Sequence, residues 1–459
     1  MEASDTTPKP RLPRPLHRVT TSFEEFAERG VLSGLLLMAC TTVALIWANS
    51  PWAESYFHLW ETMVAVGLAG SPVSGSLHHW INDGLMSVFF LLVGLEIKRE
   101  LLVGELASPR QAALPIAAAV GGMIVPAALY ALLNRGGEGA MGWGIPMATD
   151  IAFALGVLTL LGPRVPVGLK VFLTALAIAD DMGAVLVIAI FYTSAIQWSA
   201  LLVVAIAATG LIALNRWRVK GLGPYLLIGV ILWGALLSSG VHATIAGVIL
   251  ALAVPSRTTI NTTQFSARAR KLLDDFDRSE TGDLLILTSK GQQEAIYSLD
   301  VASSSAVAPL LRLEHSLHGL VSFFIMPIFA LANAGVALGG ASEMLTSPVT
   351  LGVTVGLLIG KPLGVMLFSW LAIRLRVAHL PGGVSWQQLH GAAWLAGIGF
   401  TMSLFVGSLA FGEGELLNAA KIGVLGASAI AGIAGWSLVK AATPGRRQRT
   451  VDGGGRLGA

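Results

Sequence analysis

Long apolar runs are the feature of this sequence that most constrains its fold. A transmembrane helix needs about 20 predominantly apolar residues. The runs are continuously apolar instead of alternating, so they predict helices rather than the strands of a membrane barrel. Only 12% of the residues are charged, against about 25% in soluble domains. We therefore predict an all-α polytopic membrane protein with twelve transmembrane helices, at roughly 31–48, 84–103, 112–133, 141–161, 167–191, 199–214, 223–238, 240–254, 317–337, 349–373, 388–411 and 416–439.

The Lys and Arg residues predict the orientation of these helices. The sequence has 30 of them. With the twelve predicted spans, Arg135 and Lys421 fall on one side, Lys361 falls inside a span, and all the others fall on the opposite side. Cytoplasmic loops carry the excess of basic residues in membrane proteins. We therefore expect both termini in the cytoplasm.

The spans divide the chain into two tails, two helical parts and one long loop: 1–29, 30–255, 256–310, 311–440 and 441–459. The polar segment 50–80 has no Lys or Arg and is expected on the external side. The loop 256–310 mixes acidic and basic residues, so we expect it to be solvated, with a short amphipathic helix. The single cysteine, Cys40, excludes an intrachain disulfide. The net charge of +3 does not indicate a nucleic-acid partner.

Two adjacent acids, Asp180 and Asp181, lie near the middle of the predicted span 167–191. A carboxylate at mid-bilayer costs roughly 2.5–3.5 kcal/mol even on a lenient scale. Two in a row are tolerated when they face water, a cation or protons, and their mutual repulsion favours protonation of one. The pair is therefore predicted to exchange protons for a cation. The alternative is that the acids stay protonated and only hydrogen-bond neighbouring helices.

A proline predicts a break in the span 141–161. Pro146 lacks an N–H and clashes with the preceding helical turn, so the helix is expected to stop just before Thr149 and Asp150. Irregular backbone at this depth needs protein or water beside it. The Thr149 hydroxyl, the Asp150 carboxylate and the freed carbonyls are hard oxygen donors that suit Na⁺ or Li⁺. The alternative is a simple proline kink with Asp150 at a helix end.

Lys361 is a basic residue near the centre of the predicted span 349–373. At that depth the side chain must pair with an acid or lose its proton. An aspartate of the 180/181 pair is the expected partner. A purely structural ion pair remains an alternative, because buried pairs can serve specificity.

A second break is predicted in the span 388–411, where Gly397 and Gly399 precede Thr401 and Ser403. Ordinary packing of small residues is the alternative explanation. The third to fifth and the tenth to twelfth spans form two triplets, and in each the middle helix is interrupted. Interrupted segments at matching places in two halves indicate a transporter binding site. Asp150 is expected to neutralise the positive helix ends there and Lys361 the negative ones.

A further charged cluster is predicted at the cytoplasmic end of the second span. Glu96 and Glu100 share one helical face at i, i+4. Glu314 and His315 enter the ninth span on the same side. A histidine near carboxylates can titrate close to neutral pH. The alternative is an ordinary charged collar at the membrane interface.

Other functional classes fit these residues less well. An intramembrane aspartyl protease needs two facing aspartates, one in a Gly-x-Gly-Asp setting that this sequence lacks, and it gives Lys361 no role. A retinal-type pump with Lys361 as Schiff-base carrier is disfavoured by twelve spans and by Pro362 directly after the lysine. A channel would differ from an exchanger because its flux would not saturate with Na⁺. We therefore predict a transporter and not an enzyme.

An ordered set of motifs resembles the bacterial NhaA-type sodium–proton antiporters. The resemblance runs over roughly residues 20–440 apart from the long loop. The motifs that carry it are 84–100, 146–150, 179–181, 240–244, 313–315, 360–364 and 397–403.

The resemblance implies an electrogenic antiporter of the bacterial inner membrane. It would expel Na⁺ or Li⁺ in exchange for more protons, by alternating access, with inverted repeats and two interrupted helices crossing near mid-membrane. No cofactor is expected, and a homodimer through 50–80 is possible. The resemblance implies three roles for residues of this sequence. Ion and proton binding is expected of Asp180, Asp181, Asp150 and Thr149. Charge compensation is expected of Lys361 and Asp150, with Lys361 pairing with Asp180, and pH response is expected of Glu96, Glu100, Glu314 and His315. The loop 256–310 is longer than usual, and Leu311 stands where these antiporters often have a basic residue.

Overall fold

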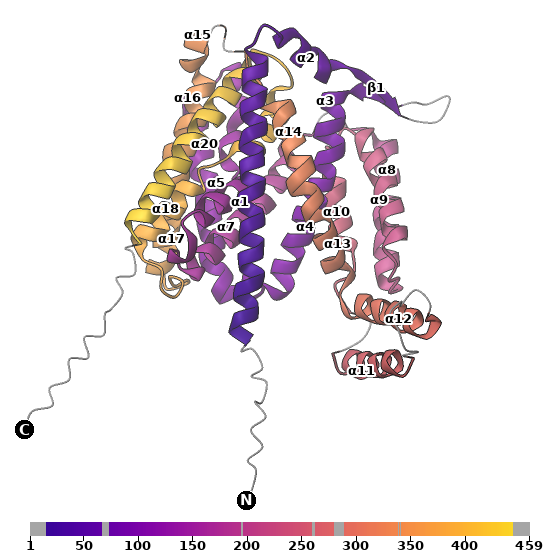
Figure 1. Ribbon diagram of the computed structural model, residues 1–459. Coiled ribbons are helices and arrows are strands. Elements are labelled where there is room, and N and C mark those ends of the chain that lie inside the picture. Colours follow the sequence, from indigo (N-terminus) through magenta and orange to yellow (C-terminus); the bar gives the residue numbers. More distant parts are fainter. Residues whose placement is uncertain are drawn as a thin grey trace, which may run out of the picture.

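The computed structural model describes residues 15–66, 73–193, 196–258, 262–279, 289–337, 339 and 341–443. These residues form a bundle of helices, as Figure 1 shows. In the described part of the chain the only strands are β1 (Met63–Val66) and β2 (Val73–Ser76), which pair antiparallel as a hairpin. The predicted all-α membrane architecture is confirmed. Most of the two predicted tails, residues 1–14 and 444–459, lies outside the described residues.

Seven helices of the described chain are long and apolar enough to cross a membrane. Three of them contain a π-helical turn: α3–η1–α4 (Leu77–His79, Trp80–Leu85, Met86–Val103), α13–η5–α14 (Pro309–Leu320, Val321–Ile325, Met326–Asn333) and α16–η6–α17 (Pro348–Val355, Gly356–Gly360, Lys361–Arg374). The other four are α5 (Pro109–Leu133), α7 (Val167–Phe191), α8 (Trp198–Arg216) and α20 (Glu415–Ala441).

Three further candidates are pairs of helices that bend at a short break. The pairs are α1 (Pro15–Ala48) with α2 (Ala53–Glu61), bent by 113°; η3 (Glu138–Met147) with α6 (Ile151–Thr159), bent by 42°; and α18 (Trp386–Leu395) with α19 (Phe400–Phe411), bent by 45°. Counting each pair as one span gives up to ten. The predicted total of twelve is not confirmed, because α9 (Leu222–Leu237) and α10 (Ile245–Ala253) are only 16 and 9 residues long.

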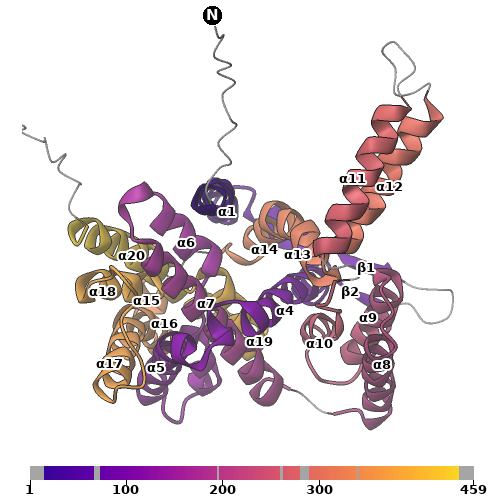
Figure 2. The same cartoon turned by 90° about the horizontal axis from the view of Figure 1, so that it is seen from below.

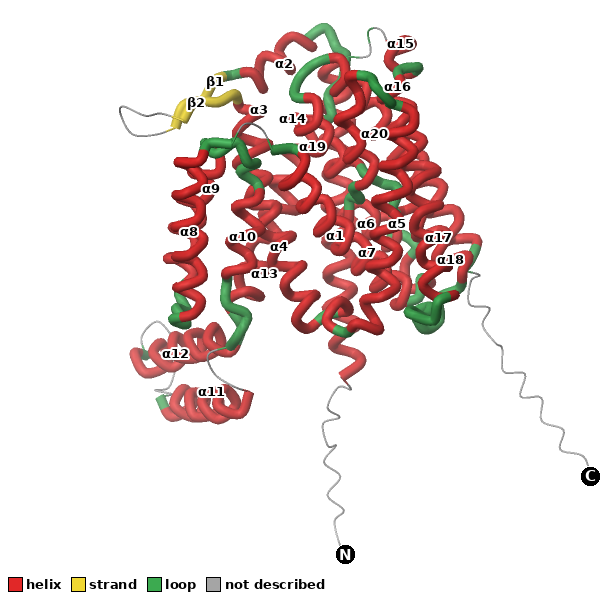
Figure 3. Tube along the Cα trace, turned by 180° about the vertical axis from the view of Figure 1, so that it is seen from behind, coloured by secondary structure: helices red, strands yellow, loops and turns green. Residues whose placement is uncertain are grey.

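The long loop contains more helix than its sequence predicts. The helices α11 (Thr262–Arg278) and α12 (Lys290–Ala306) pack against each other at one end of the bundle (Figure 1) and project outward beyond its side (Figure 2). The β-hairpin projects from the opposite end (Figure 3). Helix α1 begins at Pro15, within the segment predicted to be a tail, and a proline in the first turn is pre-organised for a helix. Three short elements complete the described chain: η2 (Glu105–Ala107), η4 (Gly162–Arg164) and α15 (Ala341–Leu345).

Helices α5 and α17 approach each other through glycine. A Cβ built on Gly364 would collide with the carbonyl oxygen of Gly121, and a Cβ on Gly121 would collide with the carbonyl oxygen of Gly364. Small residues allow such backbone contact between membrane helices, where packing rather than hydrophobic burial drives association. This contact fixes the position of Lys361, which begins α17 one turn before Gly364.

The glycine contact predicts a loss of stability in Gly364→Ala. The added methyl group overlaps backbone of α5, and overpacking of this kind costs about 1–3 kcal/mol. We expect a melting temperature several degrees below that of the parent protein in detergent. The control is Gly426→Ala in α20, where a Cβ meets no atom within 4 Å. Equal melting of the two variants would contradict the close approach.

Candidate functional site

The two interrupted helices meet at their breaks. Residues 148–150 separate η3 from α6, and residues 396–399 separate α18 from α19. The Asp150 backbone N–H donates to the carbonyl oxygen of Ile398 at 2.7 Å. The Thr149 hydroxyl donates to the Ala396 carbonyl at 2.8 Å. Both predicted breaks are confirmed, and hydrogen bonds between them satisfy backbone groups that would otherwise be unpaired inside the membrane.

Asp150 caps the positive ends of two half-helices. Its Oδ1 accepts from the Phe153 backbone N–H at 3.0 Å, in the first turn of α6. Its Oδ2 accepts from the Thr401 backbone N–H at 3.2 Å and from the Thr401 hydroxyl at 2.5 Å, in the first turn of α19. A carboxylate is stabilised where unpaired N–H groups and helix dipoles converge. Asp150 therefore has the compensating position that the sequence predicts.

Lys361 caps the negative, carboxyl-terminal end of η3. Its ammonium group donates to the carbonyl oxygen of Met147, the last residue of η3. The same Nζ lies 2.5 Å from Oδ2 of Asp180 in α7, and both side chains are fully buried. The lysine therefore joins three elements. The structure identifies Asp180 as its partner, which the position of the aspartate pair in the sequence does not decide.

Asp181 is buried without compensation from hydrogen bonds. It is 1% exposed, and neither carboxylate oxygen has a hydrogen-bond partner among the described residues. A buried unsatisfied acceptor costs about 1–3 kcal/mol, and more when it is charged. In native structures such groups call for a specific explanation, such as a functional role. The Thr149 hydroxyl lies beside Asp180, so hard oxygen donors gather around the two acids.

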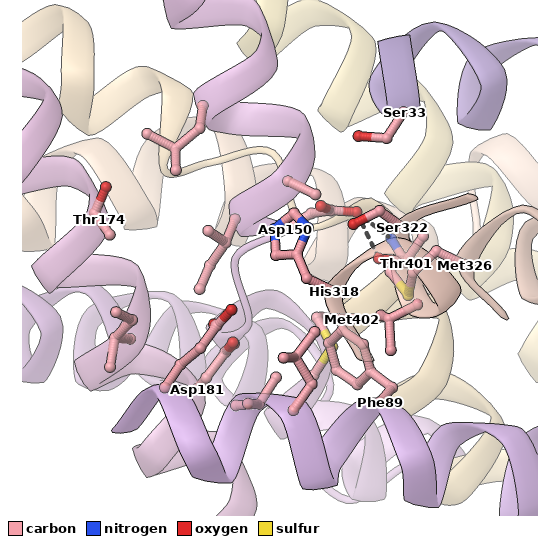
Figure 4. Close-up of a pocket in the computed structure, with 18 of the residues that line it drawn as sticks. Ser33, Phe89, Asp150, Thr174, Asp181, His318, Ser322, Met326, Thr401 and Met402 are labelled. Atoms are coloured by element: carbon pink, nitrogen blue, oxygen red, sulfur yellow. Dashed lines mark hydrogen bonds between the residues drawn. The ribbon is translucent and has the colours of Figure 1, made fainter. Parts of the chain in front are cut away.

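A cavity of about 150 Å³ reaches Asp181. Asp181, Asp150 and Thr401 line it, and the side chains in Figure 4 show Asp150 bonded to Thr401 with Asp181 across the space. Glu96, Arg99 and Glu314 line it at the end of the bundle that carries α11 and α12. Among the described residues, no three His, Cys, Asp or Glu side chains cluster as a transition-metal site would require.

Arg99 organises the charged cluster at the cavity mouth. It forms ion pairs with Glu314 at 2.8 Å and with Glu100 at 3.2 Å. The other oxygen of Glu100 accepts from the Glu105 backbone N–H just beyond α4. Glu96 interacts electrostatically with Glu314, Arg99 and Glu100. All four predicted residues are therefore brought together, since His315 interacts electrostatically with Glu314.

The fourth predicted residue, His315, is exposed on α13 and does not line the cavity. His318 lines it instead (Figure 4). The sequence contains a signal for this residue, because His318 follows Glu314 by four positions and so shares its helical face. Arg99 follows Glu96 by three positions, so the sequence also places these two side chains on one helical face.

Tyr192, just after α7, and His242, just before α10, hold η3 in place. The Tyr192 hydroxyl donates to the Met141 carbonyl at 2.8 Å and accepts from the Gly144 backbone N–H at 3.3 Å. Burial raises the pKa of Tyr192 to about 12, so it remains a neutral donor. Burial lowers the pKa of His242, which hydrogen-bonds the Tyr192 backbone. Both side chains therefore act as neutral anchors for η3 and α7.

The chain is similar over most of its length to known transport proteins. The family described as Na⁺/H⁺ antiporter 1 matches residues 24–439. A protein of Oleidesulfovibrio alaskensis named Na(+)/H(+) antiporter NhaA is 51% identical over 435 residues, which are 95% of this chain and 97% of the relative. One of the same name from Koribacter versatilis is 51% identical over 92% of this chain and 91% of the relative. Na(+)/H(+) antiporter NhaA 1 of Saccharophagus degradans is 46% identical over 94% of each chain.

The hydrogen bond between Thr401 and Asp150 predicts the behaviour of two variants. Thr401→Val removes the hydroxyl donor but leaves the backbone donors in place. Because a hydrogen bond to a charged group contributes about 1.5–3 kcal/mol, the variant should melt several degrees lower in detergent. Thr401→Ser keeps the hydroxyl and should melt close to the parent. If both variants melt alike, the hydroxyl contributes nothing to the capping of α19.

Proposed function

This chain belongs to the Na⁺/H⁺ antiporter 1 family, and from that premise we infer that it exchanges sodium ions for protons across a membrane. Membership in a transporter family confirms that the protein is not an enzyme, and the protease alternative has no support. The observation that carries the proposal within the structure is the buried, unpaired carboxylate of Asp181 beside the Asp180–Lys361 pair.

The exchange rests on competition for the same carboxylates. Na⁺ prefers hard oxygen ligands, which Asp180, Asp181 and the Thr149 hydroxyl supply. When Na⁺ binds Asp180, Lys361 loses its counter-ion, and a buried ammonium without a counter-ion is costly. Protons reverse the step: one binds Lys361, which restores its ion pair with Asp180, and one binds Asp181. Two protons would therefore replace one Na⁺, so we propose an electrogenic cycle. Li⁺ has the same ligand preference and is proposed as a second substrate.

Alternating access follows from the two breaks. The cavity that Asp181 lines extends to Glu314 near the start of α13, at the end of the bundle that carries α11 and α12. The distribution of Lys and Arg supports assigning this end, with both termini, to the cytoplasm of a bacterial inner membrane. We propose that η3–α6 and α18–α19 move as one unit, because hydrogen bonds join their breaks directly. This movement would expose the aspartates to the other side.

The proposed function includes pH regulation and a homodimer. Glu96, Arg99 and Glu314 line the same cavity as Asp181, and Arg99 is ion-paired with Glu314, so a change in this pairing would alter cation access. The β1–β2 hairpin supports a dimer through 50–80, because a two-stranded sheet leaves edge N–H and C=O groups available for pairing with a second copy.

The first functional prediction concerns Asp181→Asn, which keeps the size of the side chain and removes its charge. In inside-out vesicles with an imposed pH gradient, added NaCl or LiCl should dissipate the gradient for the parent protein, and KCl should not. Asp181→Asn should abolish the response while the protein remains folded. Asp274→Asn on α11 is the matched control and should exchange normally. Normal exchange by the Asp181 variant would refute the assignment of the ion site.

A second functional prediction concerns Arg99→Gln. The Arg99 guanidinium is the positive charge that faces Glu96 and Glu314, so its removal leaves these two acidic side chains facing each other without compensation. The activity profile measured between about pH 6.5 and 8.5 should move toward alkaline pH. Arg312→Gln, an exposed neutralisation on α13, should leave the profile in place. Identical profiles for the parent and both variants would remove the pH role of this cluster.

A further inference from the structure

A second cavity lies outside the exchange site, between the turn that follows α6 and the end of α20. Its volume is about 360 Å³. Its apolar lining, called the floor below, consists of Leu160, Leu161, Val165 and the ring of Trp436. Leu160 is 57% exposed, so the floor continues onto the outer surface of the bundle. Figure 2 shows α6 beside α20, and the two helices are in contact.

The rim of this cavity is cationic. Arg164 and Lys440 line it, together with Thr443, and no Asp or Glu does. Neither cation forms an ion pair with a carboxylate in the described chain. The Lys440 ammonium lies 4.4 Å from the centre of the Trp436 ring, which holds it at the cavity. The cavity therefore combines two uncompensated positive charges with an apolar floor.

A larger cavity at the same end of the bundle lacks this combination of uncompensated positive charges and an apolar floor. Its volume is about 460 Å³, and it lies between α5, α7 and the segment 379–382. Arg110 lines it, but Glu105 does as well, so its charges offset each other. Charge complementarity to an anion therefore singles out the cavity of Arg164 and Lys440.

We propose that the cavity of Arg164 and Lys440 binds an anionic phospholipid of the cytoplasmic leaflet. The headgroup phosphate would contact Arg164 and Lys440, with the Thr443 hydroxyl as a further donor, and an acyl chain would run over Leu160. Basic pockets at the cytoplasmic ends of membrane helices suit such headgroups, and tryptophan favours the same depth. The apolar floor selects a lipid over free phosphate. The bound lipid would join the end of α6, half of an interrupted helix, to α20.

The test is lipid-dependent stability of the full-length protein in detergent. Phosphatidylglycerol should raise the melting temperature in a saturable manner, and phosphatidylcholine should not. In the double variant Arg164→Gln/Lys440→Gln, the midpoint of the phosphatidylglycerol titration should rise at least about tenfold, since each cation near an anionic lipid contributes about a factor of five. The control Arg110→Gln/Arg374→Gln neutralises two exposed cations at the same end and should keep the parent midpoint.

Two results would overturn the proposal. One is a double variant that responds to phosphatidylglycerol with the parent midpoint. The other is equal stabilisation by inorganic phosphate at matched concentration, which would reveal an anion site without a lipid. If the double variant does not fold, Arg164→Gln and Lys440→Gln alone should each shift the midpoint about threefold to fivefold. Sodium–proton exchange is measured separately in vesicles, so loss of exchange with retained lipid binding would count against the exchange proposal alone.

Discussion

The buried ammonium group of Lys361 is the interaction on which the rest of this structure depends. A lysine at this depth is costly unless it is paired and hydrogen-bonded. Lys361 meets both conditions, through Asp180 and the Met147 carbonyl. Removal of the lysine would leave a buried carboxylate and the end of a half-helix without partners. One side chain therefore stabilises the break in η3–α6, fixes the rotation of α7 and positions α17, where glycine contact with α5 allows the required approach.

Asp150 performs the opposite task at the same crossing. It accepts from the first turns of α6 and α19, while Lys361 donates to the end of η3. The breaks thus exist inside the membrane at a moderate cost, because their ends are neutralised by side chains and joined by backbone hydrogen bonds. Of the four charged residues gathered here, only Asp181 has neither an ion pair nor a hydrogen bond among the described residues. The other three side chains satisfy one another and the helix ends without Asp181, which supports its proposed role in binding an exchangeable ion.

The sequence predicts the parts of this site that depend on local chemistry. Pro146 and the pair Gly397 and Gly399 indicate the breaks, because proline and glycine weaken a helix, although α5 continues through Pro115 and Pro126. The spacing of the residues does not decide which aspartate meets Lys361, although the family resemblance names Asp180, the partner in the structure. Adjacent residues of a helix point about 100° apart, and the rotation of α7 is set by tertiary packing. The same reason explains why His318 lines the cavity and His315 does not. The predicted eighth span contains only α10, since residues 240–244 are not helical.

The charged cluster at the cavity mouth and the proposed ion site can influence each other electrostatically, without a conformational change. Glu96 and Asp181 interact electrostatically, although they lie on different helices. A negative charge on Glu96 attracts a cation toward Asp181, and a cation at Asp181 in turn stabilises the charge on Glu96, because coupling between two binding events is reciprocal. Water in so narrow a cavity screens this interaction less than bulk water does. The proposed pH response and the proposed cation binding therefore share one field. The positive charge of Arg99 offsets part of the negative potential that the glutamates produce at the aspartates.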